Sequence, residues 1–257
     1  MIEIKNLCKS FDNSVILNSL NLTVKSGETK VIIGRSGAGK SVLLKSIIGL
    51  LKPDSGSILI NGTDVTQISD REYNKVRMEI GMLFQGGALF DSMTVMENVA
   101  FVLNEFMKLD PKTVADRVAD SLAMVGLQGI ENMKPAQLSG GMKKRVGLAR
   151  ILCMEPQTIL YDEPTSEVDP ITADAINNLI IELRDKLKVT SIVVTHDMNS
   201  AFKVADSIAM FYHGQVIAEG TPEEIRNTKH PVLKQFIYGE AKGPITENEN
   251  LIFGHVK

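Results

Sequence analysis

Residues 34–41 read Gly34-Arg35-Ser36-Gly37-Ala38-Gly39-Lys40-Ser41, and this stretch decides the fold. Residues 30–33 before it form a short β-branched run, and residues 42–51 after it are apolar nearly all round. This context predicts a strand leading in and a buried helix leading out. A glycine-rich turn placed there lets backbone N–H groups surround phosphate oxygens at the positive end of the helix. We therefore predict that all eight residues bind a nucleotide, with Lys40 reaching its β- and γ-phosphates and the Ser41 hydroxyl ligating Mg²⁺. The alternative, a glycine-rich turn with an incidental lysine, is disfavoured by the strand and helix on its two sides.

The rest of the chain carries short strand patterns separated by helical ones. The strand patterns cover residues 2–4, 20–24, 57–60, 80–84, 158–161, 191–195, 208–212 and 215–218. Residues 86–156 instead have a helical pattern, which is clearest at 115–125. Because strands alternate with helices, we predict an α/β fold whose mostly parallel sheet is covered on both faces. The helical block interrupts that sheet as an inserted subdomain, and a polar tail follows Gly239.

Composition is that of a large globular chain. The chain has 257 residues, of which 44% are apolar and 23% charged, and its net charge is −3; nothing here favours non-specific nucleic-acid binding. The spacing of its two cysteines, Cys8 and Cys153, resembles neither a metal site nor a disulfide framework, and we expect both to be buried small hydrophobes in a reducing compartment. The first residues lack the apolar stretch of a signal peptide, and no run approaches the ~18 apolar residues of a spanning helix. We therefore expect any membrane role to come through partner proteins.

A second motif, Thr158-Ile159-Leu160-Tyr161-Asp162-Glu163, is an apolar strand that ends in two acids. On its own it could be a strand end with solvated carboxylates. Downstream of a phosphate-binding loop, we predict instead that Asp162 holds Mg²⁺ directly or through water. Glu163 is then placed to polarise the attacking water as a general base.

A third motif, Leu138-Ser139-Gly140-Gly141-Met142, precedes a helix rich in Lys and Arg. A serine and two glycines at a helix N-terminus make a second anion cradle. The alternative is a helix cap that binds no ligand.

Taken in this order, the three motifs resemble those of ABC-type ATPases, and residues 138–142 are similar to the signature of that family. The resemblance covers residues 1–240 and implies a RecA-like P-loop NTPase core with an N-terminal antiparallel β subdomain and an inserted helical subdomain. The implied boundaries are 1–85 and 157–240 for the core, 86–156 for the helical subdomain and 241–257 for a C-terminal tail. The resemblance further implies an ATPase that pairs head to tail with a second copy of itself. Ser139, Gly140 and Gly141 of one copy would then close on the γ-phosphate held by the other.

The resemblance also assigns roles to residues that the patterns alone do not single out. Phe11 stands where an aromatic ring stacks on adenine, and Gln85 stands where a glutamine senses Mg²⁺ and the attacking water. Asp169 matches the aspartate of a loop that crosses the dimer interface, and His196 matches a histidine that contacts the γ-phosphate. By themselves, Phe11 could be a core side chain and His196 a structural one. The implied catalytic set is Lys40, Gln85, Glu163 and His196, and the implied Mg²⁺ ligands are Ser41, Gln85 and Asp162.

Three positions depart from the family pattern. Tyr is commoner than Phe at position 11, although stacking needs only the ring. Met142 replaces the usual Gln at the end of the signature. Glu167-Val168 occupies a loop that usually carries small and apolar residues before its Asp, so a charge there could alter communication across the dimer.

A narrower resemblance lies in residues 84–95, Phe-Gln-Gly-Gly-Ala-Leu-Phe-Asp-Ser-Met-Thr-Val, which are similar to the pattern in ATPases of Mce-type and Mla-type lipid transporters. Those proteins also tend to carry Met after the signature glycines, as Met142 does here, and residues 235–244 resemble their ending. This likeness implies transport of phospholipid or another hydrophobic lipid between membranes. It also implies as partners a permease dimer, an Mce-domain protein and a STAS-domain protein. The ATPase would be peripheral, on the cytoplasmic face of the inner membrane.

Residues 84–95 could also be the ordinary loop-to-helix connection of any ABC ATPase. The first alternative is therefore the ATPase of a polar-solute importer, for example for amino acids. A soluble ABC protein of translation or DNA repair is disfavoured because the chain has neither a second nucleotide domain nor a long coiled-coil insertion. A pure binding module is disfavoured by its complete set of catalytic residues.

Coupling to a membrane partner needs a surface on the helical block. Ala88, Leu89, Phe90 and Met93 are expected to form an apolar lip there, with Phe90 as the strongest anchor. The alternative is that these side chains pack inside the subdomain.

Overall fold

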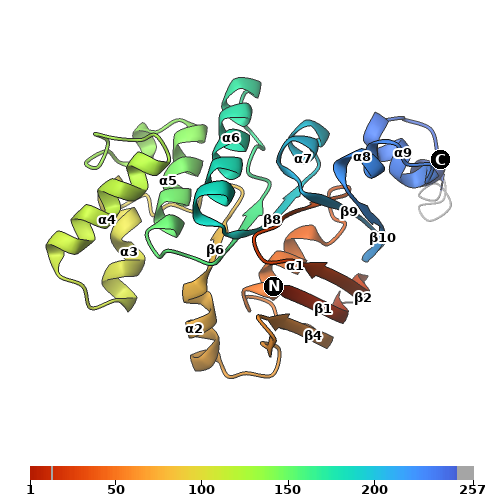
Figure 1. The fold of residues 1–257 in the computed structure, drawn as a ribbon, viewed down its shortest axis with the longest axis horizontal. Helices are drawn as coiled ribbons and strands as arrows, with labels where there is room; N and C mark the ends of the chain where they lie inside the picture. Colours follow the sequence, from red (N-terminus) through yellow and green to blue (C-terminus); the bar gives the residue numbers. More distant parts are fainter. Residues whose placement is uncertain (13, 248–257) are drawn as a thin grey trace.

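The computed structural model describes residues 1–12 and 14–247. It contains two sheets, and Figure 1 shows helices gathered around them and a separate lobe of helices at the left. The strands are β1 (Ile2–Phe11), β2 (Ser14–Val24), β3 (Thr29–Ile33), β4 (Ser55–Ile60), β5 (Thr63–Asp64), β6 (Ile80–Leu83), β7 (Thr158–Asp162), β8 (Thr190–Thr195), β9 (Ser207–Tyr212) and β10 (Gln215–Gly220). The helices are α1 (Lys40–Ile47), α2 (Asp70–Glu79), α3 (Val95–Phe106), α4 (Pro111–Met124), the 3₁₀ turn η1 (Pro135–Gln137), α5 (Gly140–Leu152), α6 (Pro170–Leu187), α7 (Met198–Val204), α8 (Pro222–Arg226) and α9 (Pro231–Tyr238).

The larger sheet has six strands in the order β10-β9-β3-β8-β7-β6. Its strands pair in parallel from β9 to β6, and only the edge strand β10 pairs antiparallel in this described sheet. Every residue of β3, β7 and β8 is buried, because helices cover both faces of the sheet. Successive residues serve opposite cores: Val31 and Ile33 pack into one, and Ile32 into the other.

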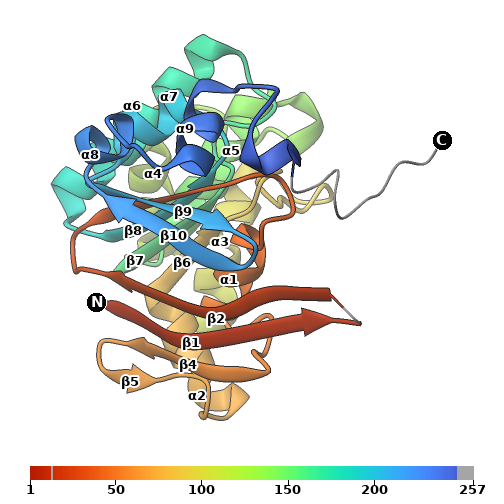
Figure 2. The same ribbon diagram turned by 90° about the vertical axis from the view of Figure 1, so that its right-hand side faces the viewer.

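The smaller sheet has the order β2-β1-β4-β5 and is antiparallel throughout. Helix α1 lies between the two sheets (Figure 2). Its Leu43, Leu44 and Ile47 share one core with Ile4 of the small sheet and Val194 of the large one. This shared core fixes the phosphate-binding loop, which leads into α1, relative to both sheets.

Helices α3, α4 and α5 stand between β6 and β7 in the chain and form the yellow and green lobe of Figure 1. Their buried faces pack on one another through Val99, Leu103, Val118, Leu122 and Leu148. The prediction of an α/β P-loop fold with an antiparallel β subdomain and an inserted helical block is confirmed.

The structure corrects three expectations. Helix α1 ends at Ile47 rather than near residue 51, because Gly49 takes a left-handed φ of 68° and Leu50 is exposed. Cys153 is buried, but Cys8 is partly exposed on β1, where the pairing with β2 is irregular. The predicted polar tail begins as an ordered segment in which Ile245 is buried; residues 248–257 of that tail lie outside the described part.

Within the described residues, no helix is long and apolar enough to cross a membrane.

Candidate active site

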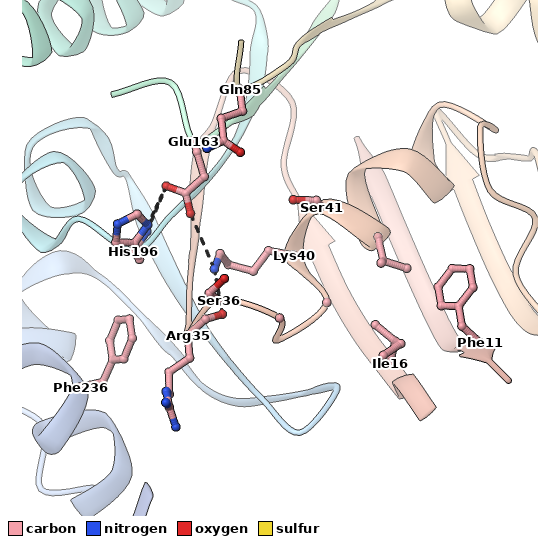
Figure 3. A pocket seen from close by; sticks show the side chains of 13 residues that line it. Phe11, Ile16, Arg35, Ser36, Lys40, Ser41, Gln85, Glu163, His196 and Phe236 are labelled. Carbon is pink, nitrogen blue, oxygen red and sulfur yellow. Dashed lines mark hydrogen bonds and ion pairs between the residues drawn. The ribbon is translucent and has the colours of Figure 1, made fainter. Parts of the chain in front are cut away.

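A cavity of about 650 Å³ lies at the carboxyl ends of the parallel strands. Strands β3, β8, β7 and β6 are neighbours in the sheet, so the residues that follow them meet at one edge, where ligands bind in open α/β sheets. The predicted residues that line the cavity are Phe11, Arg35, Ser36, Gly37, Gly39, Lys40, Ser41, Gln85, Glu163 and His196 (Figure 3). Gly34 and Ala38 lie in the same loop, and Asp162 contacts it through Ser41.

The loop between β3 and α1 has a conformation that depends on glycine. Gly39 takes φ 99°, and a Cβ there would lie 2.9 Å from the carbonyl oxygen of Ile16. Among the described residues no side chain caps α1 and no acid stands in its first turn. The first N–H groups of the helix therefore face the cavity with their partial positive charge uncompensated, which suits a phosphate.

Lys40 is buried below this loop, with 6% of its surface exposed. Its Nζ donates to the carbonyl oxygens of Gly34 at 2.7 Å and Arg35 at 3.1 Å, and lies 3.8 Å from Oε1 of Glu163. Burial lowers the pKa of Lys40, and the carboxylates of Glu163 and Asp162 oppose that shift. The arrangement holds a cation where the loop would hold phosphate oxygens.

Ser41 and Asp162 are joined by a hydrogen bond of 2.8 Å from the Ser41 hydroxyl to Oδ1 of Asp162. Burial raises the pKa of the Asp162 carboxyl, and the Ser41 hydroxyl offsets part of that shift. Gln85 lines the cavity together with Ser41, so the donor set is a hydroxyl, a carboxylate and an amide oxygen, which are the hard oxygen ligands that Mg²⁺ prefers. No group of three or more His, Cys, Asp or Glu able to hold a metal occurs in residues 1–12 and 14–247.

Glu163 faces both Lys40 and His196. His196 Nδ1 lies 3.0 Å from Glu163 Oε2, and the His196 backbone N–H donates to the same oxygen at 3.4 Å. A carboxylate oxygen accepts hydrogen bonds, so the tautomer of His196 with its proton on Nδ1 would donate to Glu163. The backbone of Glu163 has a left-handed φ of 50°. Its N–H donates to the carbonyl oxygen of Val194 on β8 at 3.0 Å. These contacts aim a carboxylate into the cavity, where it can accept a proton from water.

Besides Gly34, Ala38 and Asp162, which lie next to it, four predicted site residues in the described part of the chain do not line this cavity: Ser139, Gly140, Gly141 and Asp169. Ser139 caps α5, since its Oγ accepts from the Met142 N–H at 3.3 Å. A Cβ on Gly141 would lie 2.4 Å from Cγ2 of Thr172 on α6. Asp169 caps α6 and accepts from the N–H groups of Ile171 and Thr172 at 3.0 Å. Ser139, Gly141 and Asp169 therefore have local structural roles in their own chain.

The sequence did not single out three side chains that line the cavity, those of Ile16, Val42 and Phe236. Ile16 lies on β2 near Phe11, and Phe236 of α9 enters from the opposite side, near Arg35 and His196 (Figure 3). In the sequence, Phe236 belongs to an amphipathic helix whose apolar residues, such as Val232 and Leu233, are core. Only the packing of α9 places its ring at the cavity.

The site combines a glycine-rich loop, a buried lysine below it and a carboxylate in contact with a histidine. This arrangement suits hydrolysis of a nucleoside triphosphate and defines the class of P-loop ATPases. The model of the family described as ABC transporter matches residues 17–166. The chain belongs to the ABC transporter family and is an ATP-binding, ATP-hydrolysing subunit. Subunits of this family form dimers and work with membrane permeases.

Relatives with assigned names match over nearly the whole chain. The "Probable ribonucleotide transport ATP-binding protein mkl" of Mycobacterium tuberculosis H37Rv is 43% identical over 96% of this chain and 69% of its own. The "Intermembrane phospholipid transport system ATP-binding protein MlaF" of Haemophilus influenzae is 42% identical over 95% of this chain and 93% of its own. A solved dimeric bacterial ABC transporter cassette superposes with a TM-score of 0.81 at 35% identity, covering 86% of this chain and 99% of that one.

Proposed function

We propose that the cavity binds MgATP and that Glu163 is the general base of its hydrolysis. Residues 34–41 hold the phosphates, Lys40 neutralises the β- and γ-phosphates, and Phe11 stacks on the adenine ring. His196 contacts the γ-phosphate and keeps Glu163 aimed at the attacking water. The observation that carries this proposal is the convergence of the Lys40 ammonium and the His196 imidazole on the Glu163 carboxylate.

We propose that Ser41, Asp162 and the amide oxygen of Gln85 hold Mg²⁺. The metal, when bound, neutralises charge that develops on the phosphate oxygens. The chain's own contribution is a set of oxygen donors from three elements, since Ser41 lies in the first turn of α1, Asp162 ends β7 and Gln85 follows β6.

We propose that Ser139, Gly140 and Gly141 act on the nucleotide of a second copy, and that Asp169 lies at the interface between the copies. Supporting this, α5 begins at Gly140 with Ser139 as its N-cap, so its amide groups can serve an anion, yet these residues lie away from their own chain's cavity. The division into a core of residues 1–85 and 157–240, a helical subdomain of 86–156 and a tail of 241–257 belongs to the same proposal.

We propose further that ATP hydrolysis powers transport of phospholipid or a similar hydrophobic lipid between membranes. The likeness to MlaF supports this, because it extends over nearly the full length of both chains. The name of the mycobacterial relative refers instead to ribonucleotides, which keeps a polar solute as the competing substrate class.

The proposed partners are a permease dimer, an Mce-domain protein and a STAS-domain protein, with this subunit peripheral on the cytoplasmic face of the inner membrane. The exposed side chain of Phe90, at 43%, supports an anchor for the permease on the helical lobe. Leu89 beside it is half-buried, so the apolar lip is partly packed against the core of the lobe.

The test is to purify the tagged subunit from native membranes together with its partners, and to reconstitute that complex in lipid vesicles. We expect permease subunits to co-purify, phospholipid to stimulate ATPase activity, and ATP to drive transfer of labelled phospholipid to acceptor vesicles. The matched control is the same complex carrying Glu163→Gln, which should transfer none. Stimulation by a ribonucleotide or another polar solute, with no lipid transfer, would contradict the lipid assignment.

A further inference from the structure

Glu167 makes a side-chain contact with Gln85 that joins the end of β6 to the loop after β7. Nε2 of Gln85 donates to Oε1 of Glu167 over 3.1 Å, across 82 residues of sequence. Gln85 lines the nucleotide cavity, and Glu167 stands two residues before Asp169. The contact therefore links a proposed Mg²⁺ ligand to the loop that leads into α6.

This hydrogen bond decides which way the Gln85 amide points. A glutamine amide has one donating and one accepting end, whereas an ionised carboxylate only accepts. Glu167 therefore fixes the NH₂ group of Gln85 on its own side and leaves the amide oxygen on the other. In Figure 3 that oxygen lies on the side of Ser41, the residue whose hydroxyl donates to Asp162.

The backbone that carries Glu167 is held firmly. Lys144 of α5 has 5% of its surface exposed, and its Nζ donates to the carbonyl oxygens of Glu163 and Ser166 and to the Ser166 hydroxyl. Glu167 itself takes a left-handed φ of 60°, a conformation that costs energy for a side chain with a Cβ and persists where surrounding contacts hold it. The buried lysine thus holds the backbone of the loop just before Glu167.

We propose that Glu167 is a positioning residue that orients the amide oxygen of Gln85 toward the Mg²⁺ site. The inference rests on the proposed role of Gln85 as a metal ligand. Without the Glu167 carboxylate, the Gln85 amide can turn over. The NH₂ group of Gln85, which cannot ligate a cation, then faces the metal site for part of the time. The charge that replaces the usual small residue in this loop then serves the metal site of its own chain.

The experiment compares Glu167→Ala, Glu167→Gln and Gln85→Ala in the purified full chain. The readout is the Mg²⁺ concentration that gives half-maximal binding of a fluorescent, non-hydrolysable ATP analogue. We expect Glu167→Ala to raise that concentration about 3- to 10-fold, the size of one lost hydrogen bond. Glu167→Gln keeps an accepting oxygen and should stay within about twofold of the parent. Both variants share the left-handed backbone, so backbone strain does not distinguish them.

The double variant Gln85→Ala/Glu167→Ala tests whether the two residues act together. It should need no more Mg²⁺ than Gln85→Ala alone, because Glu167 has nothing left to orient. If Gln85→Ala shifts the Mg²⁺ requirement and Glu167→Ala leaves it unchanged or lowers it, the inference is overturned while the role of Gln85 stands. A shift in Glu167→Gln as large as in Glu167→Ala overturns it too, since charge and not orientation then matters. If Gln85→Ala itself causes no shift, the proposed metal role of Gln85 fails.

Discussion

Replacing Phe90 by alanine separates a docking surface from a core position. Residue Phe90 is 43% exposed, and its ring packs on that of Phe101 with centroids 4.8 Å apart. Full burial of a phenylalanine side chain stabilises the folded state by about 1.5–3 kcal/mol. Because Phe90 is somewhat more than half buried, somewhat over half of that free energy applies here. With the ring pair included, we expect Phe90→Ala to lower the free energy of unfolding by about 2 kcal/mol. A fully buried phenylalanine would cost about 3–5 kcal/mol.

The assay pairs denaturant unfolding of the isolated subunit with its binding to the membrane subunits. If Phe90 fills a pocket in the permease, we expect affinity to fall on the order of 30-fold, as at an interface hot spot. Phe106→Ala is the matched control on the same helical lobe; its ring is 64% exposed, so stability should change by less than ~1 kcal/mol. Unchanged permease binding by a folded Phe90→Ala subunit, or an unfolding cost above ~4 kcal/mol, would refute the docking role.

Three further predictions concern the site. Dimers of one Lys40→Ala chain and one Ser139→Arg chain keep one intact composite site, so they should hydrolyse ATP faster than either pure variant; mixed dimers no better than the pure variants would count against a shared site. Phe11→Ala should weaken binding of a fluorescent ATP analogue by about 0.5–1.5 kcal/mol while Phe11→Tyr does not, and equal binding by all three proteins would remove the ring from the adenine site. Burial raises the pKa of Asp162, so the folded protein holds a proton there up to a higher pH than the unfolded chain does. The stability of the nucleotide-free protein therefore falls as pH rises through that raised pKa. Asp162→Asn should remove this pH dependence and leave the ligand-free protein more stable near neutral pH in thermal unfolding, whereas a less stable variant would show that the carboxylate is not strained by burial.

Local sequence signals predicted the elements that carry the site. The apolar run before Asp162 became β7, every residue of which is buried. The β-branched run before Gly34 became β3, and the apolar segment after Ser41 became most of α1. These features depend on residues a few positions apart, so one sequence contains the information.

Contacts between distant segments were not predictable in the same way. The hydrogen bond between Gln85 and Glu167 depends on how two loops leave β6 and β7, which are neighbours in the sheet. Phe236 reaches the cavity only because α9 packs on the large core. Cys8 is partly exposed because an irregular stretch of β1 breaks the strict alternation that burial predictions assume.

The most direct test of the central claim is ATP hydrolysis by Glu163→Gln. Glu163 is the carboxylate that His196 holds at 3.0 Å and Lys40 approaches at 3.8 Å, and its amide counterpart keeps the shape but cannot take a proton. We predict that the variant binds ATP like the parent, loses at least ~10²-fold in turnover, and accumulates as an ATP-bound dimer in size-exclusion chromatography. Turnover close to that of the parent would contradict the assignment of Glu163 as the general base.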